Sequence, residues 1–137
     1  MSRELSILLI EDDKIEKMKV KRTMETHGLH HKIIEANNGE EALQILSGSK
    51  NLPDIILLDL NMPKINGLEF LKILKDDTRL KYLPVIVVTT SANHKDVKQC
   101  YELGIAGYIT KPLKYEKYVE KLKIVLDYWS SNELFGS

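Results

Sequence analysis

Side chains that could bind a cation or a phosphoryl group stand where four short apolar runs of the chain end. They are Glu11, Asp12 and Asp13 after the first run, Asp59 at the end of the second, Thr89 in the third and Lys111 after the fourth. Crowded carboxylates repel one another unless a cation joins them, and hard oxygen ligands suit Mg²⁺ or Mn²⁺. A lysine suits phosphate as a point charge, and a carboxylate can be a covalent nucleophile. The set predicts metal-assisted phosphoryl transfer to Asp59.

Each of these signals has an ordinary structural explanation when it stands alone. Acids after a strand often cap the next helix, so "EDD" could be only a helix start. Thr89 could simply end a strand, and Lys111 stands in a "KP" pair that is common in loops. Asp59 is the hardest to explain structurally, because an unpaired charge inside an apolar run is costly to bury. The combined order of these residues therefore favours chemistry over chance.

An alternation of strands and helices could bring these residues together. Apolar runs predict strands over 5–10, 31–36, 54–59, 84–90 and 106–110. Segments of helical length lie at about 14–27, 39–47, 65–75, 94–103 and 115–129. This order predicts an α/β fold, a parallel five-stranded (βα)5 sheet with helices on both faces. In such a sheet, ligands bind at the carboxyl ends of the strands, where the polar residues listed above follow.

Length and composition exclude several classes of protein. The chain has 137 residues, no formal net charge and one cysteine, Cys100. We expect a single domain with a core over about 4–129 and a short tail over 130–137. Balanced charge argues against direct nucleic-acid binding, and the short apolar runs argue against a membrane span. A single cysteine rules out an internal disulfide, so we expect a cytoplasmic protein.

Four stretches together resemble the receiver domain of two-component response regulators. They are "ILLIEDD", "PDIILLDLNMPKINGLEFL", "PVIVVTTSA" and "GYITKPL". The resemblance implies a flavodoxin-like fold with strand order 2-1-3-4-5, and phosphorylation of Asp59 by a histidine kinase or a phosphotransfer protein. It implies that Mg²⁺ (or Mn²⁺) is held by Glu11, Asp12, Asp59 and the backbone carbonyl of Asn61. Thr89 and Lys111 match the residues that contact the phosphoryl group.

The resemblance also implies how such a protein signals. Thr89 and Tyr108 would form a switch that changes the face made by helix 94–103, strand 106–110 and helix 115–129. Asn61, Thr90 and Ser91 would tune phosphorylation and hydrolysis, and we expect the bulk of Thr90 to slow access to the site. The Lys111–Pro112 peptide bond is usually cis in this family. A receiver of this kind is a signalling protein that promotes its own phosphotransfer and dephosphorylation, not a conventional enzyme.

The partners can be stated only in general terms. The chain resembles stand-alone receivers without an output domain, in particular the small regulators paired with phytochrome-type histidine kinases. Lysines in the first helix, at Lys14, Lys17 and Lys21, are either a solvated face or a surface for an acidic partner. Aromatic and apolar residues near the end of the chain either pack in the core or form a homodimer or partner face. These residues are Tyr128, Trp129, Leu134 and Phe135.

Other protein classes explain the sequence less well. A haloacid-dehalogenase-type phosphatase needs a second aspartate two residues after the first, where this chain has Asn61. A flavodoxin-like flavin binder needs a phosphate loop after its first strand, where this chain has three acids, and the GxGxxG of dinucleotide binders is absent. The remaining alternative is a degenerate receiver that binds partners without phosphorylation.

Overall fold

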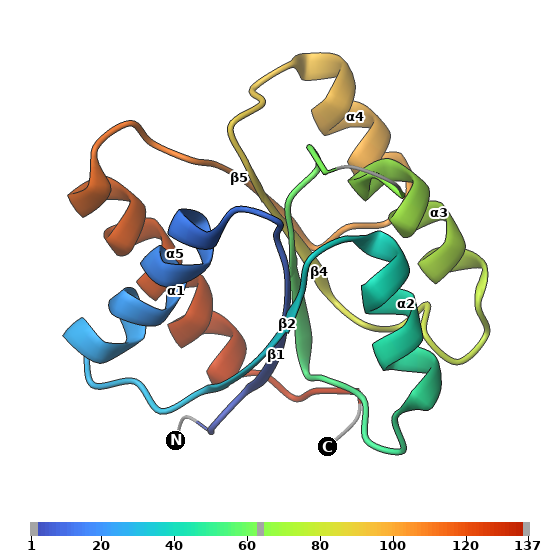
Figure 1. The fold of residues 1–137 in the computed structure, drawn as a ribbon, viewed down its shortest axis with the longest axis horizontal. Coiled ribbons are helices and arrows are strands. Elements are labelled where there is room, and N and C mark those ends of the chain that lie inside the picture. The colour runs from blue at the N-terminus through green and yellow to red at the C-terminus, as the bar shows by residue number, and fades with distance from the viewer. Residues whose placement is uncertain (1–2, 63–64, 136–137) are drawn as a thin grey trace.

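The chain forms one parallel sheet between two layers of helices. A computed structural model describes residues 3–62 and 65–135. The sheet has five strands in the order β2-β1-β3-β4-β5, and all neighbouring strands are parallel. Helices α1 and α5 cover one face, and α2, α3 and α4 cover the other (Figure 1). The (βα)5 prediction and its strand order are therefore confirmed.

The observed elements follow the predicted ones closely. The strands are β1 (Ser6–Ile10), β2 (Lys32–Ala36), β3 (Ile55–Leu58), β4 (Val85–Thr89) and β5 (Gly107–Thr110). The helices are α1 (Lys14–Thr26), α2 (Gly39–Gly48), α3 (Gly67–Asp76), α4 (His94–Glu102) and α5 (Tyr115–Ser130). Asp59 lies one residue beyond β3, not inside it. None of the helices in the described ranges is both long and apolar enough to cross a membrane.

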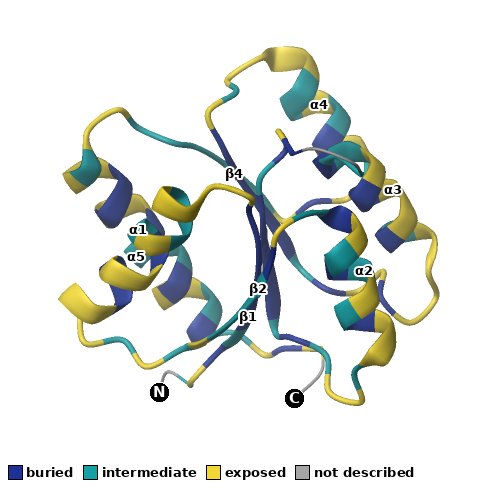
Figure 2. Ribbon diagram, in the orientation of Figure 1, coloured by how far each residue is buried: buried dark blue, intermediate teal, exposed yellow. Residues whose placement is uncertain are grey.

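The three central strands are buried on both faces, as their uninterrupted apolar runs predict. Alternate residues point to opposite layers: Leu8 and Ile56 pack under α2, α3 and α4, and Leu9 and Leu57 pack under α1 and α5. Figure 2 shows these strands as the buried centre of the molecule, with exposed residues on the outer faces of the helices. Since both faces are covered, polar residues of these strands can reach solvent only at the strand ends.

Local signals start and stop the helices next to the site. The Asp13 carboxylate caps α1 by accepting hydrogen bonds from the backbone N–H groups of Ile15 and Glu16. Asn66 and Glu69 form a reciprocal capping box at the start of α3. Gly28 and Gly104 follow α1 and α4 with φ angles of 61° and 89°, which favour glycine. The caps at Asp13 and Asn66 fix the loops that carry Asp12 and Asp59.

The segment after α5 is part of the packed structure. The Arg3 N–H donates to the Ser130 carbonyl at 3.0 Å, and the Arg3 guanidinium lies 3.7 Å from the Glu133 carboxylate. Leu134 is 8% exposed and belongs to the core cluster under α1 and α5. Of the two alternatives for Leu134, core packing or a partner face, the structure therefore supports core packing, because burying this side chain removes its apolar surface from water.

The peptide bond before Pro112 also differs from the expected one. The described residues contain no cis peptide bond, so the Lys111–Pro112 bond is trans. The trans form is the more stable isomer of an X–Pro bond by about 0.5–1 kcal/mol. The cis expectation, which came only from the resemblance, was wrong.

Candidate functional site

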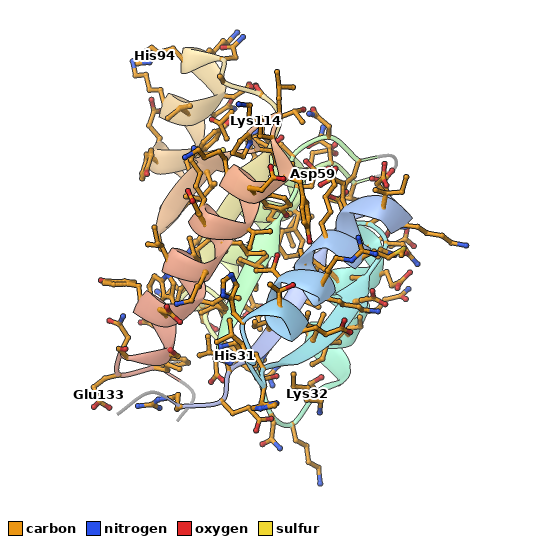
Figure 3. All side chains as sticks on the ribbon, turned by 90° about the vertical axis from the view of Figure 1, so that its left-hand side faces the viewer. His31, Lys32, Asp59, His94, Lys114 and Glu133 are labelled. Atoms are coloured by element: carbon orange, nitrogen blue, oxygen red, sulfur yellow. The ribbon has the colours of Figure 1, made fainter. Side chains whose placement is uncertain are left out.

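Polar side chains from four strand ends meet at one edge of the sheet. Carboxylate oxygens of Glu11, Asp12 and Asp59, one from each residue, all lie within 4.8 Å of one another. They line a depression of about 210 Å³ together with Asn61, Thr90 and Lys111. Figure 3 shows Asp59 near the end of the molecule that carries His94 and Lys114, with His31, Lys32 and Glu133 at the other end. The structure thus brings together the acids and the lysine that the sequence predicts.

Glu11 and Lys111 form a buried ion pair at the base of this site. The Lys111 ammonium donates to Glu11 Oε1 at 2.8 Å, and their side chains are only 10% and 5% exposed. Burial raises the pKa of Glu11 to about 7, although the bond from Lys111 opposes the change. Burial alone would lower the pKa of Lys111, but the hydrogen bond and charge of Glu11 outweigh it and raise the pKa. The lysine therefore stays protonated, as a contact to phosphate requires.

Asp59 avoids the cost of a buried charge because it lies just outside the strand. Its backbone N–H still donates to the Ile10 carbonyl at 3.1 Å, which fixes the residue against β1. Its side chain is half-buried, and Oδ1 accepts from the Asn61 N–H at 3.4 Å. The carboxylate therefore faces the acidic depression and the lysine, not the apolar core.

The residues at the end of β4 divide into two groups. Thr89 is fully buried, and its Oγ1 has no hydrogen-bond partner among the described residues. Thr90 is exposed and lines the depression. Ser91 turns toward α4, where its hydroxyl donates to the Asp96 carboxylate at 2.8 Å. Of the proposed tuning residues on this loop, Thr90 contributes to the lining and Ser91 does not.

Tyr108 of β5 is connected to the same loop. Its hydroxyl donates to the Ser91 carbonyl at 2.8 Å, and its ring packs against the core under α2, α3 and α4. Burial raises the pKa of Tyr108 above its ordinary value, so the hydroxyl remains a donor. The ring therefore joins β5 to the start of α4 in a half-buried position.

Two further acids line the depression, and the sequence analysis interpreted only one of them. Asp13 caps α1, as its position after the acid pair suggests. Glu16 was missed: its Oε2 lies 3.3 Å from Lys111 Nζ, and its side chain is 21% exposed. The available signal was its position, because Glu16 lies in the first turn of the helix that follows the acid pair. Sequence alone did not reveal that Lys111 would lie opposite that turn.

The donor set fits a small divalent cation. Glu11, Asp12 and Asp59 supply carboxylate oxygens, the ligand type that Mg²⁺ and Mn²⁺ prefer. The open depression leaves room for water and phosphate oxygens, which commonly complete the shell of Mg²⁺.

Comparison with known proteins identifies the family. Residues 7–123 match the response regulator receiver domain. The chain belongs to this family. It is 35% identical over 127 residues to the probable methanogenesis regulatory protein FilR2 of Methanothrix harundinacea, which covers 90% of this chain and 82% of that protein.

Two solved receivers share the whole architecture. The phosphorylated cyanobacterial phytochrome response regulator RcpA superposes with a TM-score of 0.90 and 32% identity, covering 97% of this chain and 99% of that one. The Mn²⁺-bound response regulator Rcp1 superposes with a TM-score of 0.85 and 33% identity, covering 94% and 96%. Receivers are signalling regulators that interact with histidine kinases or phosphotransfer proteins, and the acidic cluster here fits their divalent cation.

Proposed function

We propose that this receiver accepts a phosphoryl group on Asp59 in a reaction that depends on Mg²⁺ or Mn²⁺. The observation that carries the proposal is the meeting of Glu11, Asp12, Asp59 and Lys111 at one open edge of the sheet. Glu11, Asp12, Asp59 and the Asn61 carbonyl would hold the cation. When bound, the cation would offset negative charge on the phosphoryl oxygens. Asp12 is exposed, which suits an exchangeable ion.

The reaction would be a displacement at phosphorus. A carboxylate oxygen of Asp59 forms the new P–O bond, and the P–N bond to the donor histidine breaks as the imidazole leaves with its electron pair. Lys111 supplies a fixed positive charge for the transferring group, and the Thr89 hydroxyl supplies a donor. The same residues would later accommodate water attack on the acyl phosphate.

The signal would leave through a switch between Thr89 and Tyr108. The unpartnered Thr89 hydroxyl can gain a bond by moving toward a phosphoryl oxygen. That movement would let Tyr108 settle further inward and change the face of α4, β5 and α5. Support comes from the Tyr108–Ser91 bond, which already connects β5 to the loop before α4. Asn61 and Thr90 border the acceptor and would tune the lifetime of the phosphoryl group, and Ser91 would act through this loop.

The partners would be a histidine kinase or phosphotransfer protein and a downstream protein, in the cytoplasm. Two of the three lysines considered above also serve the fold, since Lys21 pairs with Glu35 at 3.0 Å and Lys17 donates to Asn37.

A homodimer through α5 and the tail would use Tyr128 and Phe135, which are 61% and 58% exposed. Sedimentation equilibrium over a range of concentrations, with and without phosphodonor, tests it. A monomer mass throughout would exclude the dimer.

The central proposal is tested by mass spectrometry with a small-molecule phosphodonor and Mg²⁺. We expect one added phosphate on the wild type, none on Asp59→Asn, and none on the wild type when the cation is chelated. Asp54→Asn is a control, because Asp54 lies at the opposite end of β3 and accepts from the Ser6 N–H. The alternative is a degenerate receiver that binds partners without phosphorylation, and an unmodified wild type would favour it.

A further inference from the structure

Lys111 is shared between two carboxylates, and only one of them belongs to the proposed cation site. Its ammonium donates to Glu11 Oε1 at 2.8 Å and lies 3.3 Å from Glu16 Oε2. Glu16 Oε2 is buried and accepts no hydrogen bond from any described residue. The other oxygen of Glu16 accepts from Lys19 at 3.0 Å on the same helix. Glu16 is thus held beside Lys111 with one oxygen still free to accept.

Glu11 is fully engaged in this arrangement. Oε1 accepts from Lys111, and Oε2 lies 3.4 Å from the Asp13 N–H, which donates to it. A divalent cation on Glu11 would draw electron density from the carboxylate that Lys111 uses, so the Lys111–Glu11 bond weakens when the cation binds. A second acceptor beside Lys111 offsets that loss, since a buried ammonium that is poorly paired is costly.

We propose, on the basis of the function proposed above, that Glu16 is a positioning residue that receives Lys111 when Glu11 turns to the cation. A small movement of the ammonium from Glu11 toward Glu16 would keep its charge paired and leave it facing Asp59. Glu16 thereby lowers the free-energy cost of cation binding. Asp13 supports this arrangement, since its cap fixes the N–H of Glu16 and hence the first turn of α1.

The test is the affinity of the unphosphorylated protein for Mn²⁺ alone, measured from the electron paramagnetic resonance signal of free Mn²⁺. We expect Glu16→Gln to weaken binding by roughly two- to tenfold, the lower part of the range for side chains in one hydrogen-bonded network. In a Lys111→Met background, where no ammonium needs a partner, the same substitution should have little effect. Glu120→Gln, an exposed change of equal charge on α5 beside Lys117, is the matched control.

The outcomes separate this inference from the proposed function. An equal loss of affinity with and without Lys111 would mean that Glu16 acts only through its charge, and would overturn the inference. Wild type that binds no Mn²⁺ would instead contradict the cation site itself. If Glu16→Gln does not fold, a crystal structure of wild type with Mn²⁺ decides: Lys111 bonded to Glu16 supports the inference, and Lys111 still on Glu11 refutes it.

Discussion

At the scale of single residues, the site depends on charges that the surrounding backbone makes tolerable. Asp59 lies one position beyond β3 and faces a solvent-accessible depression, whereas Glu11 is 4% exposed and needs Lys111. Removing Glu11 or Lys111 leaves the charge of the other buried and unpaired, so substitutions at this pair are poor tests of what sets the phosphorylation rate. Thr90 is better suited, because it is exposed at the rim.

We predict that Thr90→Ala accelerates phosphorylation by a small phosphodonor and hydrolysis of the acyl phosphate by severalfold each. Thr90 lines the depression beside Asp59, so a smaller side chain opens the path for the donor and for water. The measurement is the rate of phosphate gain and loss with Mg²⁺ present. Thr26→Ala is the control, since Thr26 is an exposed threonine at the far end of α1. Equal rates in Thr90→Ala and wild type would remove the steric explanation.

A second residue-scale prediction concerns pH and His31. Burial lowers the pKa of His31 below its ordinary value of 6.5, and His30 lowers it further, whereas Asp127 and Glu4 oppose the change. The neutral ring accepts from the Leu5 N–H at 2.9 Å through Nδ1. Since the unfolded chain takes up the proton more readily, the stabilisation from this bond is complete above pH 6.5 and is lost as the pH falls toward the lowered pKa.

His31→Asn keeps an acceptor near the position of Nδ1 but cannot titrate. We therefore expect the urea midpoint of wild type to fall more than that of His31→Asn between about pH 7.5 and 5.5, the range in which histidines change charge. His27→Asn is the control, because His27 is exposed and is not among the groups that shift the pKa of His31. Urea midpoints of wild type and His31→Asn that change in parallel with pH would show that protonation of His31 does not cause the loss of stability.

At the scale of elements, the loop between β3 and α3 is held by close backbone contact. A Cβ atom on Gly67 would lie 2.6 Å from Leu60 Cα and 2.9 Å from the Asp59 carbonyl oxygen. Neither backbone atom can move without moving Asp59, the proposed acceptor. The first residue of α3 is therefore coupled to the position of Asp59.

We predict that Gly67→Ala lowers the free energy of unfolding by about 1–3 kcal/mol, the usual cost of overpacking, and also slows phosphorylation of Asp59. Gly48→Ala is the matched control. A Cβ there meets nothing within 4 Å, and alanine is the better helix former by about 1 kcal/mol, so stability should hold or rise. Urea unfolding and phosphate incorporation measure the two effects. A Gly67→Ala variant as stable as wild type would show that the loop between β3 and α3 can shift to accommodate the added methyl group, and would contradict this prediction.

At the scale of the whole molecule, residues near the two ends of the described chain meet at the end of the sheet opposite the site. Arg3, which precedes β1, contacts both Ser130 and Glu133 at the end of α5 and just beyond it. Leu134 fills the core under α1 and α5, and Phe135 stacks on Tyr82 with ring centroids 5.0 Å apart. The segment after α5 therefore closes the fold at that end.

We predict that Leu134→Ala lowers the free energy of unfolding by about 2–5 kcal/mol, as for other buried leucines, without abolishing phosphorylation of Asp59. Phe135→Ala should cost about 1 kcal/mol or less, because that ring is 58% exposed. Chemical denaturation of both variants tests this. A small loss in Leu134→Ala would mean that the segment does not hold the core closed.

The fold and most of the site followed from the sequence because their signals are local or periodic. Uninterrupted apolar runs identify central strands, caps such as Asp13 and Asn66 identify helix starts, and parallel strands bring their carboxyl ends to one edge. These rules are sufficient to gather Glu11, Asp12, Asp59 and Lys111. Helix α1 has an interrupted apolar pattern and is predicted mostly from the alternation of strands and helices, yet it buries Val20, Thr23 and Met24.

Tertiary structure decided which side chains meet across large sequence separations. Whether Glu16 reaches Lys111, whether Leu134 is core or surface, and whether Ser91 faces the site or Asp96 depend on how layers pack and on individual rotamers. Sequence periodicity specifies a face of a helix but not what lies opposite that face. The sequence thus determined the fold and the side chains that gather at the candidate site, and the packing determined how their charges are shared.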